Sequence, residues 1–329
     1  MPQPIPEIGV VLIGRNEGDR LKAALAAIPD HVAQVVYVDS GSTDGSVEAA
    51  LAAGAEVVEL DLTVPFTAAR ARNAGFARLR EIVPVEFVQF IDGDCILQPG
   101  WLGTARAFLE NTPGCAVVCG RRRERFPEAS IYNRLCDQEW DTPVGEALAC
   151  GGDALMRAEV FEDMGGFDPS VIAGEEPELC QRLRRAGWTI WRIDAEMTLH
   201  DADMHSFGQW WTRARRFGHA AAEGAAMHGA GPDQHGVRST ARALAWGVAL
   251  PLVIVVLALI VSPWVLVLLL IYPVQVLRLS RRYGAVSGPA FGMKQATFAV
   301  IAKFPEMIGA LQYLGQRLSG QGSRIIEYK

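Results

Sequence analysis

An unbroken stretch of 35 uncharged residues, Ala243–Leu277, limits the possible folds of this chain more than any other feature. One helix of that length would measure about 52 Å, which exceeds the ~30 Å thickness of the hydrocarbon core of a bilayer. Ser262 and Pro263 lie near its middle and favour a break. The stretch predicts a transmembrane hairpin over residues 243–278, made of two short helices with a break near 262–263. The alternative is a pair of buried helices in a soluble domain.

The charges beside this stretch predict its orientation. Arginines stand on both sides of it, at Arg238, Arg242, Arg278, Arg281 and Arg282. Because basic flanks of membrane spans lie preferentially in the cytoplasm, two crossings would leave both ends there. We therefore expect a protein of the plasma membrane or the bacterial inner membrane with its first domain in the cytoplasm. Residues 279–329 are expected to form a basic cytoplasmic or interfacial tail.

The charge differs in sign between the two parts of the chain. The 329 residues carry a net charge of −6, but residues 1–237 sum to −14 and residues 238–329 to +8. An acidic first part argues against nucleic acid as a partner, because phosphate backbones require a basic face. The basic run at 121–125 is expected to be a solvated face or a contact for an anionic acceptor or lipid headgroups. The six cysteines form no CxxC pair, and we expect free thiols.

Short apolar segments alternate with helix-like segments before the uncharged stretch. The expected strands are 8–13, 35–38, 57–60 and 87–91. This alternation predicts an α/β fold with a mainly parallel sheet flanked by helices. We expect this domain to span residues 1–226, and residues 227–242 to be a linker or juxtamembrane segment. Polar residues follow several of the strands, where open α/β sheets bind ligands.

Asp92, Gly93 and Asp94 follow the last of these strands. In an extended chain, residues i and i+2 point to the same side, so both carboxylates can face one site. Paired carboxylate oxygens suit Mg²⁺ or Mn²⁺, which proteins commonly share with phosphates of a substrate. The sequence therefore predicts a divalent metal site at this point. The alternative is an ordinary surface turn, because Asp-Gly is a common turn pair.

Three other segments carry polar residues suited to a nucleotide. Arg15 and Glu17 follow the first strand, and Asp39 ends the second, where a carboxylate can accept from a ribose or a base. Arg72 offers a guanidinium for bidentate contact with a diphosphate. Residues 42–44 are also read as a turn and a helix cap.

Six segments, in their order along the chain, resemble the family 2 glycosyltransferases with the GT-A nucleotide-sugar fold. They are GRNEGDRL, VDSGSTDGS, ARNAG, FIDGDC, GGFDP and GEEPELCQRLRRAGW. The resemblance covers roughly residues 7–205. It implies metal-assisted transfer of a sugar, with inversion, from a nucleotide-sugar to the hydroxyl of an acceptor.

The resemblance also implies roles for individual residues. Asp92 and Asp94 would form the metal–diphosphate motif around Gly93, with Asp94 the direct ligand. The residues bordering the nucleotide would be Arg15, Glu17, Asp39 and Arg72. Gly152 and Asp153 would contact the donor sugar, because glycine lets the backbone approach a ligand. In some relatives a histidine after the catalytic residues completes the metal shell, which makes His200 a candidate; the alternative is a hydrogen-bonded histidine at a strand end.

The general base is expected in the cluster that begins at Glu175. Members of this family usually carry Glu-Asp here, with the aspartate as base, whereas this chain has Glu175 and Glu176. Glu176 stands at the place of the base and is one methylene longer, so both glutamates stay candidates beside Asp94 for the catalytic groups. The alternative reading is that these acids stabilise the N-terminus of the following helix.

Together these features predict a membrane-anchored glycosyltransferase in cell-surface polysaccharide or glycolipid synthesis. The expected donor is a nucleotide-sugar, by general expectation a UDP-sugar, and the expected acceptor is a lipid-linked molecule or a glycan. Two alternatives are a nucleotidyltransferase on a related sheet and a membrane-tethered nucleotide-sugar-binding or scaffold protein without turnover.

Overall fold

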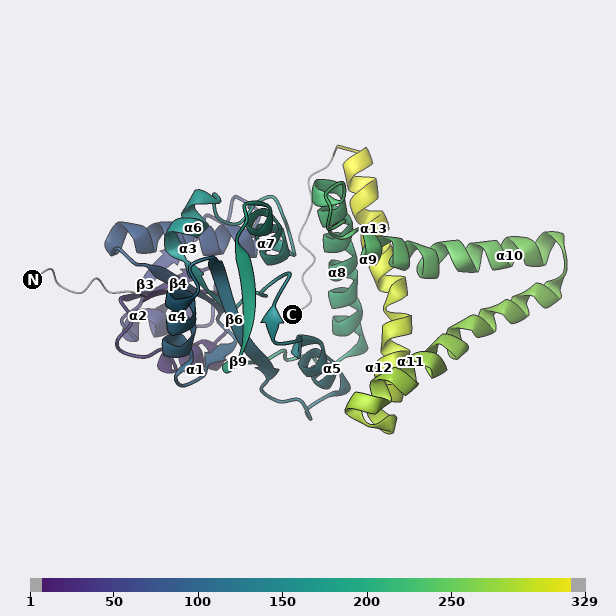
Figure 1. Cartoon of the computed structure of the whole chain (residues 1–329), viewed down its shortest axis with the longest axis horizontal. Helices are drawn as coiled ribbons and strands as arrows, with labels where there is room; N and C mark the ends of the chain where they lie inside the picture. The colour runs from purple at the N-terminus through teal and green to yellow at the C-terminus, as the bar shows by residue number, and fades with distance from the viewer. Residues whose placement is uncertain (1–7, 321–329) are drawn as a thin grey trace, which may run out of the picture. The chain divides into compact units, whose positions relative to one another are not determined.

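The computed structural model describes residues 8–320. The chain divides into two compact units, Met1–His205 and Ser206–Lys329 (Figure 1). The first residues of the expected domain 1–226 and the last of the expected tail 279–329 lie outside the described residues.

A mixed sheet forms the centre of the first unit. Within residues 8–320 the strand order is β3-β2-β1-β4-β8-β6-β9-β5, and β7 pairs with β9. The strands are β1 (Ile8–Gly14), β2 (Gln34–Asp39), β3 (Glu56–Glu59), β4 (Phe87–Asp92), β5 (Cys95–Leu97), β6 (Cys115–Glu124), β7 (Gly145–Glu146), β8 (Ala154–Arg157) and β9 (Thr189–His200).

The first half of the sheet is parallel, as the sequence predicts, and the second half is not. Strands β3, β2, β1 and β4 pair in parallel. In contrast, β8 runs antiparallel to β4 and β6, and β5 runs antiparallel to β9. Only Gly93 and Asp94 separate β4 from β5 in the chain, but the two strands are not neighbours in the sheet. Strand β6 pairs with β9 in parallel, and the register shifts between Cys119 and Arg122.

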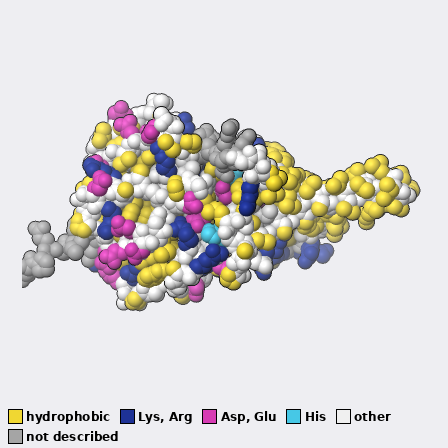
Figure 2. All heavy atoms as spheres, turned by 90° about the horizontal axis from the view of Figure 1, so that it is seen from above, with side chains coloured by type: hydrophobic (Ala, Val, Ile, Leu, Met, Phe, Trp, Pro, Cys, Tyr) yellow, Lys and Arg dark blue, Asp and Glu magenta, His cyan; other side chains and the backbone are white. Residues whose placement is uncertain are grey.

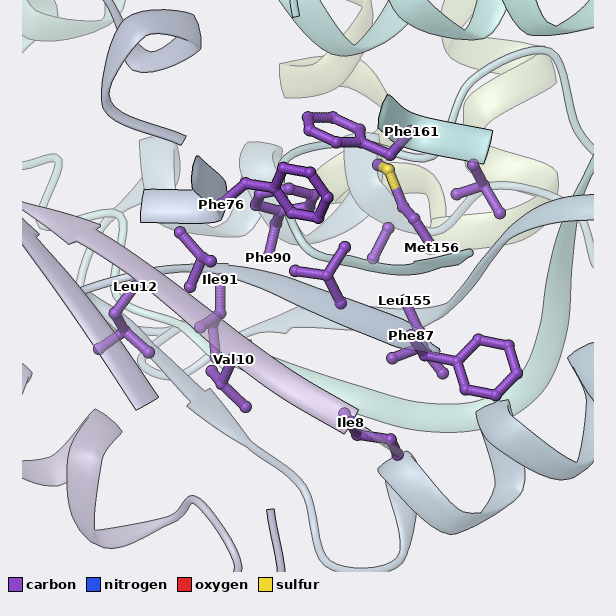
Figure 3. Packing of buried hydrophobic residues seen from close by; sticks show 14 of the residues in the cluster. Ile8, Val10, Leu12, Phe76, Phe87, Phe90, Ile91, Leu155, Met156 and Phe161 are labelled. Carbon is purple, nitrogen blue, oxygen red and sulfur yellow. The ribbon is translucent and has the colours of Figure 1, made fainter. Parts of the chain in front are cut away.

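Helices pack around the sheet (Figure 1). They are α1 (Asp19–Ala26), α2 (Ser46–Ala52), α3 (Ala68–Ile82), α4 (Trp101–Asn111), α5 (Ile131–Trp140), α6 (Ala158–Asp163) and α7 (Glu175–Arg185). Figure 3 shows part of the core, where Phe76 of α3, Phe90 of β4 and Phe161 of α6 meet. The ring centroids of Phe76 and Phe161 are 4.7 Å apart, and those of Phe90 and Phe161 are 4.9 Å apart. This aromatic cluster fixes α3 and α6 against the central strand.

The register of the parallel strands aligns the ends that carry polar residues. Gly14 at the end of β1 pairs with Asp39 at the end of β2. On the other side, Ile13 of β1 pairs with Asp92 at the end of β4. The carboxyl ends of three adjacent strands are therefore level, and the loops that follow them start side by side.

The second unit consists of helices. They are α8 (Phe207–His228), α9 (Val237–Leu244), η1 (Ala245–Ala249), α10 (Leu250–Ile260), η2 (Pro263–Leu270), α11 (Ile271–Ser287), α12 (Pro289–Ile301) and α13 (Lys303–Leu318). Glycines let α8 and α13 approach closely: a Cβ on Gly309 would lie 1.9 Å from the carbonyl oxygen of Arg215. Because α8 packs on α13, the division falls after His205, earlier than the boundary expected at 226. The expected linker 227–242 holds the end of α8 and most of α9.

Two helical stretches of the described residues are long and apolar enough to cross a membrane. They span Val237–Ile260 and Pro263–Ser287, with 24 and 25 residues. The chain turns between them at Val261 and Ser262. Their large apolar side chains are widely exposed, and the hydrophobic colour covers the arm that they form in Figure 2. Both stretches are longer than the spans of 17–18 residues that dividing the uncharged stretch in two would give, because α9 and the end of α11 extend the helices beyond it.

The close packing of α3 on the sheet gives a test of the fold. A Cβ on Gly75 would lie 2.5 Å from Cγ1 of Val11 and 2.7 Å from Cγ2 of Val38. We expect Gly75→Ala to destabilise the first unit by about 1–3 kcal/mol, because overpacking forces neighbours out of their rotamers. Gly103 of α4 is exposed, and among the described residues no atom lies within 4 Å of a Cβ built there.

Gly103→Ala is therefore the matched control, and its higher helix propensity should leave stability unchanged or raise it by up to about 1 kcal/mol. The measurement is the thermal melting of the full-length protein in detergent. Equal melting temperatures for the two variants would contradict the packing described here.

Candidate active site

The loops after β1 and β2 are bound to each other. The backbone N–H of Asn16 donates to Oγ of Ser42 at 2.8 Å, and the N–H of Thr43 donates to Oδ1 of Asn16 at 2.8 Å. Asn16 has a φ of 55°, a left-handed conformation that asparagine tolerates better than most residues. Asn16 is not among the site residues predicted from the sequence, although it lies between Arg15 and Glu17 in a loop that follows a strand.

Asp39 uses its carboxylate to hold its own loop. Oδ1 accepts from the hydroxyl of Tyr37 at 3.0 Å, and Oδ2 accepts from the N–H groups of Gly41 and Ser42 at 2.8 Å each. The carboxylate is buried. Asp39 therefore fixes the shape of the loop at the expected nucleotide edge. Asp44 accepts from Ser46 at the start of α2, in line with the turn-and-cap reading of residues 42–44.

Arg15, Glu17 and Gly93 lie at the same end of the sheet. Arg15 is exposed, and Glu17 forms an ion pair with Arg20 at 2.9 Å. The N–H of Gly93 donates to the carbonyl oxygen of Ile13 at 2.8 Å, and a Cβ on Gly93 would lie 3.2 Å from Cγ of Glu17. Gly93 thus lets the turn after β4 lie against the loop after β1. Their contact with a nucleotide stays a prediction.

Arg72 is a buried cation that joins two of the predicted carboxylates. Helix α3 carries it, and its Nη2 lies 2.7 Å from Oδ1 of Asp92, while its Nη1 lies 2.5 Å from Oε1 of Glu175. Burial alone would lower the pKa of Arg72, but the charges of Asp92 and Glu175 raise it above its ordinary value. The arginine therefore stays charged and holds β4 and the start of α7 together.

Gly152 lies at the centre of the predicted site. A Cβ there would be 2.7 Å from Nη2 of Arg72, 3.1 Å from Oδ2 of Asp92 and 3.3 Å from Oε1 of Glu176. Residues predicted from four separate segments thus come together: Arg72, Asp92, Gly152, and the adjacent Glu175 and Glu176. The absence of a side chain at 152 lets the loop before β8 lie directly against the arginine and the acids.

A second arginine, Arg122 of β6, also reaches this cluster. Its Nη2 lies 3.6 Å from Oδ2 of Asp92, its Nε lies 3.6 Å from Oδ2 of Asp153, and its guanidinium covers the ring of Trp140 at 4.9 Å. In the sequence, residues 121–125 form a single basic run. Within that run Arg122 turns inward, whereas Arg121 pairs with Asp194 near the surface. Arg121 and Arg122 are adjacent in the chain, and the register of β6 against β9 shifts between them, so their side chains point to different places.

Asp153 lies behind the cluster. It is fully buried; Oδ1 accepts from the N–H of Asp92 at 3.2 Å, and Oδ2 accepts from the hydroxyl of Thr198 at 2.8 Å. Both carboxylate oxygens thus have partners inside the protein. These contacts let Asp153 position Asp92 and Arg122, and its contact with the donor sugar stays a prediction.

Asp94 and His200 face each other on the other side of the turn after β4. Oδ1 of Asp94 lies 3.4 Å from Nε2 of His200, and both side chains are buried. The antiparallel pairing of β5 with β9 places Cys95 opposite His200. One ligand atom from each of Asp94, Cys95 and His200 lies within 4.8 Å of the others, as do those of Asp92, Cys95 and Asp153. Cys95 was not singled out from the sequence, although it adjoins Asp94.

The two groups differ in their suitability for a cation. Asp92 already faces Arg72 and Arg122, and Asp153 faces Arg122. Burial alone would raise the pKa of Asp92, but the two arginines lower it below its ordinary value. Because these arginines compensate Asp92, the pair Asp94 and His200 is better placed to hold a divalent metal, with Asp92 next to it.

The environment distinguishes Glu175 from Glu176. Glu175 is buried and ion-paired with Arg72. Glu176 is partly buried, and burial together with the charge of Glu175 raises its pKa to about 7. A carboxyl group with this pKa can exchange a proton near neutral pH, which a general base requires.

Comparison with known proteins supports the class of protein that the six sequence segments resemble. Residues 10–165 match the model of glycosyl transferase family 2. Glycosyltransferase AglE of Haloferax volcanii is 24% identical over 203 residues, which cover 58% of this chain and 65% of that protein. The pre-mycofactocin glycosyltransferase of Mycobacterium tuberculosis is 27% identical over 241 residues, which cover 69% of this chain and 49% of that protein. The chain thus spans less than two thirds of the length of either relative.

A solved structure resembles the whole fold. The mannosyltransferase PcManGT from Pyrobaculum calidifontis, in complex with GDP-Man and Mn²⁺, has a TM-score of 0.62 at 20% identity, over 95% of this chain and 88% of that one. The sheet, its flanking helices and this likeness define a GT-A glycosyltransferase fold, as the sequence predicts. The family match, the curated relatives and this fold together support a family 2 glycosyltransferase.

Proposed function

We propose that this protein transfers a sugar from a nucleotide-sugar to the hydroxyl of an acceptor, with inversion and with the assistance of a divalent metal. One observation carries the proposal: Glu176, with a pKa of about 7, shares the space around Gly152 with Arg72 and Asp92. A proton acceptor, the buried Arg72 and the partly buried Arg122 within one site meet the needs of a displacement that deprotonates a hydroxyl and releases a diphosphate.

The donor set of Asp94 and His200 fits a divalent metal. A carboxylate oxygen beside an imidazole nitrogen suits Mn²⁺, and the carboxylate alone suits Mg²⁺. The Pyrobaculum mannosyltransferase binds Mn²⁺ with its donor, which supports the same cofactor here. When bound, such a cation neutralises the charge that develops on the leaving diphosphate. Asp92, held by Arg72 and Arg122, would keep the turn of residues 92–94 in place.

Glu176 acts as the general base in this proposal, and Glu175 acts as a positioning residue. The ion pair with Arg72 favours the charged form of Glu175 and fixes its side chain. Glu176 stands closer to Gly152 than Glu175 does and would accept the proton of the acceptor hydroxyl as the oxygen attacks the anomeric carbon. Inversion follows from a single displacement of this kind.

The second unit would hold the enzyme at a membrane with its first unit in the cytoplasm. Its two apolar stretches expose large side chains, and arginines lie near the start of the first stretch and near the end of the second. Anchorage favours an acceptor that is itself in the membrane, such as a lipid-linked molecule or a growing glycan, in cell-surface polysaccharide or glycolipid synthesis. The donor is expected to be a UDP-sugar or, as in the Pyrobaculum structure, a GDP-sugar.

The metal assignment predicts the behaviour of Asp94→Asn. In the wild-type protein, Mn²⁺ together with the donor nucleotide should raise the melting temperature, because a ligand at 100 times its Kd stabilises the native state by about 2.7 kcal/mol. Asp94→Asn should lose this joint effect, whereas Asp163→Asn, an exposed change on α6, should keep it. The measurement is thermal unfolding with UDP- and GDP-sugars, with and without Mn²⁺. An unchanged shift in Asp94→Asn would exclude Asp94 as a ligand.

The raised pKa of Glu176 predicts a pH dependence. The base is active only when deprotonated, so the transfer rate should rise with pH through about 7 and level off above it. Glu176→Gln should lower turnover by about 10²- to 10⁴-fold, remove this rise and leave donor binding intact.

Glu176→Asp keeps a carboxylate and should retain part of the rate, and Glu159→Gln, an exposed change on α6, should behave as wild type. The measurement is the release of nucleoside diphosphate from pH 5 to pH 9. A normal rate in Glu176→Gln would place the base elsewhere.

The membrane anchor predicts the outcome of Val274→Arg in α11. A buried charge near the centre of a span costs roughly 2.5–3.5 kcal/mol of insertion free energy. Val274→Arg should therefore reduce the fraction of protein that stays with washed membranes. Leu51→Arg is the matched control, because Leu51 of α2 is 58% exposed and Val274 is 59% exposed. Equal membrane fractions for both variants would contradict the proposed span.

A further inference from the structure

Two cysteine thiols lie in contact beside the proposed site. Sγ of Cys150 and Sγ of Cys180 are 3.6 Å apart, although 30 residues separate them in the chain. Cys150 precedes Gly151 and Gly152 in the loop before β8, and Cys180 lies one helical turn after Glu176 on α7. The pair thus connects the loop that carries Gly152 with helix α7, which carries Glu176.

The geometry leaves a short path to a covalent bond. A disulfide has an S–S distance of about 2.05 Å, so the sulfurs would need to approach by about 1.5 Å. Cys150 is half-buried, while Cys180 is fully buried, so a small oxidant reaches Cys150 first. Gly151 is exposed with a φ of 82°, and among the described residues no atom lies within 4 Å of a Cβ built there. The loop can therefore shift at this point with little steric resistance.

Cys150 is a thiol in the resting protein. The hydrogen bond with Cys180 and burial raise the pKa of Cys150 well above its ordinary value. Since the thiolate is the reactive form, oxidation at neutral pH is slow and requires a sustained supply of oxidant. The pair is therefore expected to be reduced under ordinary cytoplasmic conditions.

We propose that Cys150 and Cys180 form a reversible disulfide that arrests sugar transfer under oxidising conditions. A peroxide oxidises the Cys150 thiol to a sulfenic acid and is itself reduced, with hydrogen peroxide giving one water. The sulfur of Cys180 then attacks the sulfenic sulfur; the S–S bond forms, and the hydroxyl leaves with the proton of Cys180 as a second water. A dithiol reductant reverses the bond and becomes a disulfide in turn.

The bond would act on the site through the two segments that it joins. A Cβ on Gly152 would already lie 3.3 Å from Oε1 of Glu176, so there is little room between the loop and α7. Drawing Cys150 toward Cys180 shifts this loop against the helix that carries the base. A displacement of about 1 Å in a catalytic arrangement can cost on the order of 100-fold in rate. This effect on transfer rests on the proposed function, whereas the disulfide itself does not.

A third thiol provides the control. Cys119 of β6 is buried, and burial with the neighbouring Cys180 raises its pKa to about 12. Because Cys119 interacts electrostatically with Cys180, it is the thiol that could compete with Cys150 for a bond to Cys180. Cys119→Ser should leave the disulfide unaffected, whereas Cys150→Ser should prevent it.

The experiment uses the full-length protein in detergent, treated with hydrogen peroxide, alkylated at its free thiols and digested without reductant. We expect a peptide pair joined through Cys150 and Cys180 in the wild-type protein and in Cys119→Ser, and none in Cys150→Ser. Transfer by the wild-type protein and by Cys119→Ser should fall at least about 10-fold after peroxide and recover with dithiothreitol. Cys150→Ser should keep its rate.

Several outcomes would overturn the proposal. Alkylation of both Cys150 and Cys180 after peroxide treatment of folded protein would do so, as would a bond that joins Cys180 to Cys119. A disulfide that forms without a change in transfer would remove the regulatory role. Because the peptides are mapped without any assay of activity, a protein with no detectable transfer would still show whether the bond forms, and failure of the proposed function would be recognised separately.

Discussion

The arrangement of the site depends on the buried guanidinium of Arg72. A buried charge is costly unless it is paired, and removing one partner of a buried pair costs about 3–5 kcal/mol. Arg72 meets this requirement with Asp92 from β4 and Glu175 from α7, so three elements far apart in sequence are joined at one point. The pairing also places the two glutamates in different electrostatic environments. Glu175 is compensated, whereas Glu176 stands beside a negative charge in a partly buried place, and this difference gives Glu176 its pKa of about 7.

The sequence was informative where function depends on strand ends and local motifs. Alternating apolar segments located β1, β2, β3 and β4, the end of β4 led to Asp92 and Asp94, and a separate helical motif led to Arg72. It was uninformative where a contact depends on pairing between distant strands. The inward turn of Arg122 follows from the bulged register of β6 against β9, and Cys95 meets His200 only because β5 pairs with β9. The expected role of Asp153 at the sugar came from the resemblance and stays a prediction; the sequence carried no information about its burial against Asp92 and Thr198.

The second unit shows a different limit. Composition alone located the two apolar stretches, because a long absence of charge needs no tertiary information. The boundary of the first unit was less accessible, since α8 is amphipathic and could pack on either unit. Its packing on α13 depends on Gly218 and Gly309, whose missing side chains let the two backbones approach. Single small residues of this kind have no distinctive signal until the partner helix is known.

The short link between β4 and β5 has a consequence for the sheet itself. The two strands are four positions apart in the sheet, which would separate them by about 19 Å if the sheet were flat. Only Gly93 and Asp94 connect them, and a three-residue step from Asp92 to Cys95 spans at most about 10 Å. The strands from β4 through β8, β6 and β9 to β5 must therefore curve strongly, and the irregular register of β6 contributes to the bend. The turn of residues 92–94 spans the two ends of this curved segment, so a cation held by Asp94 and His200, as proposed, would tie β5 and β9 to the end of β4.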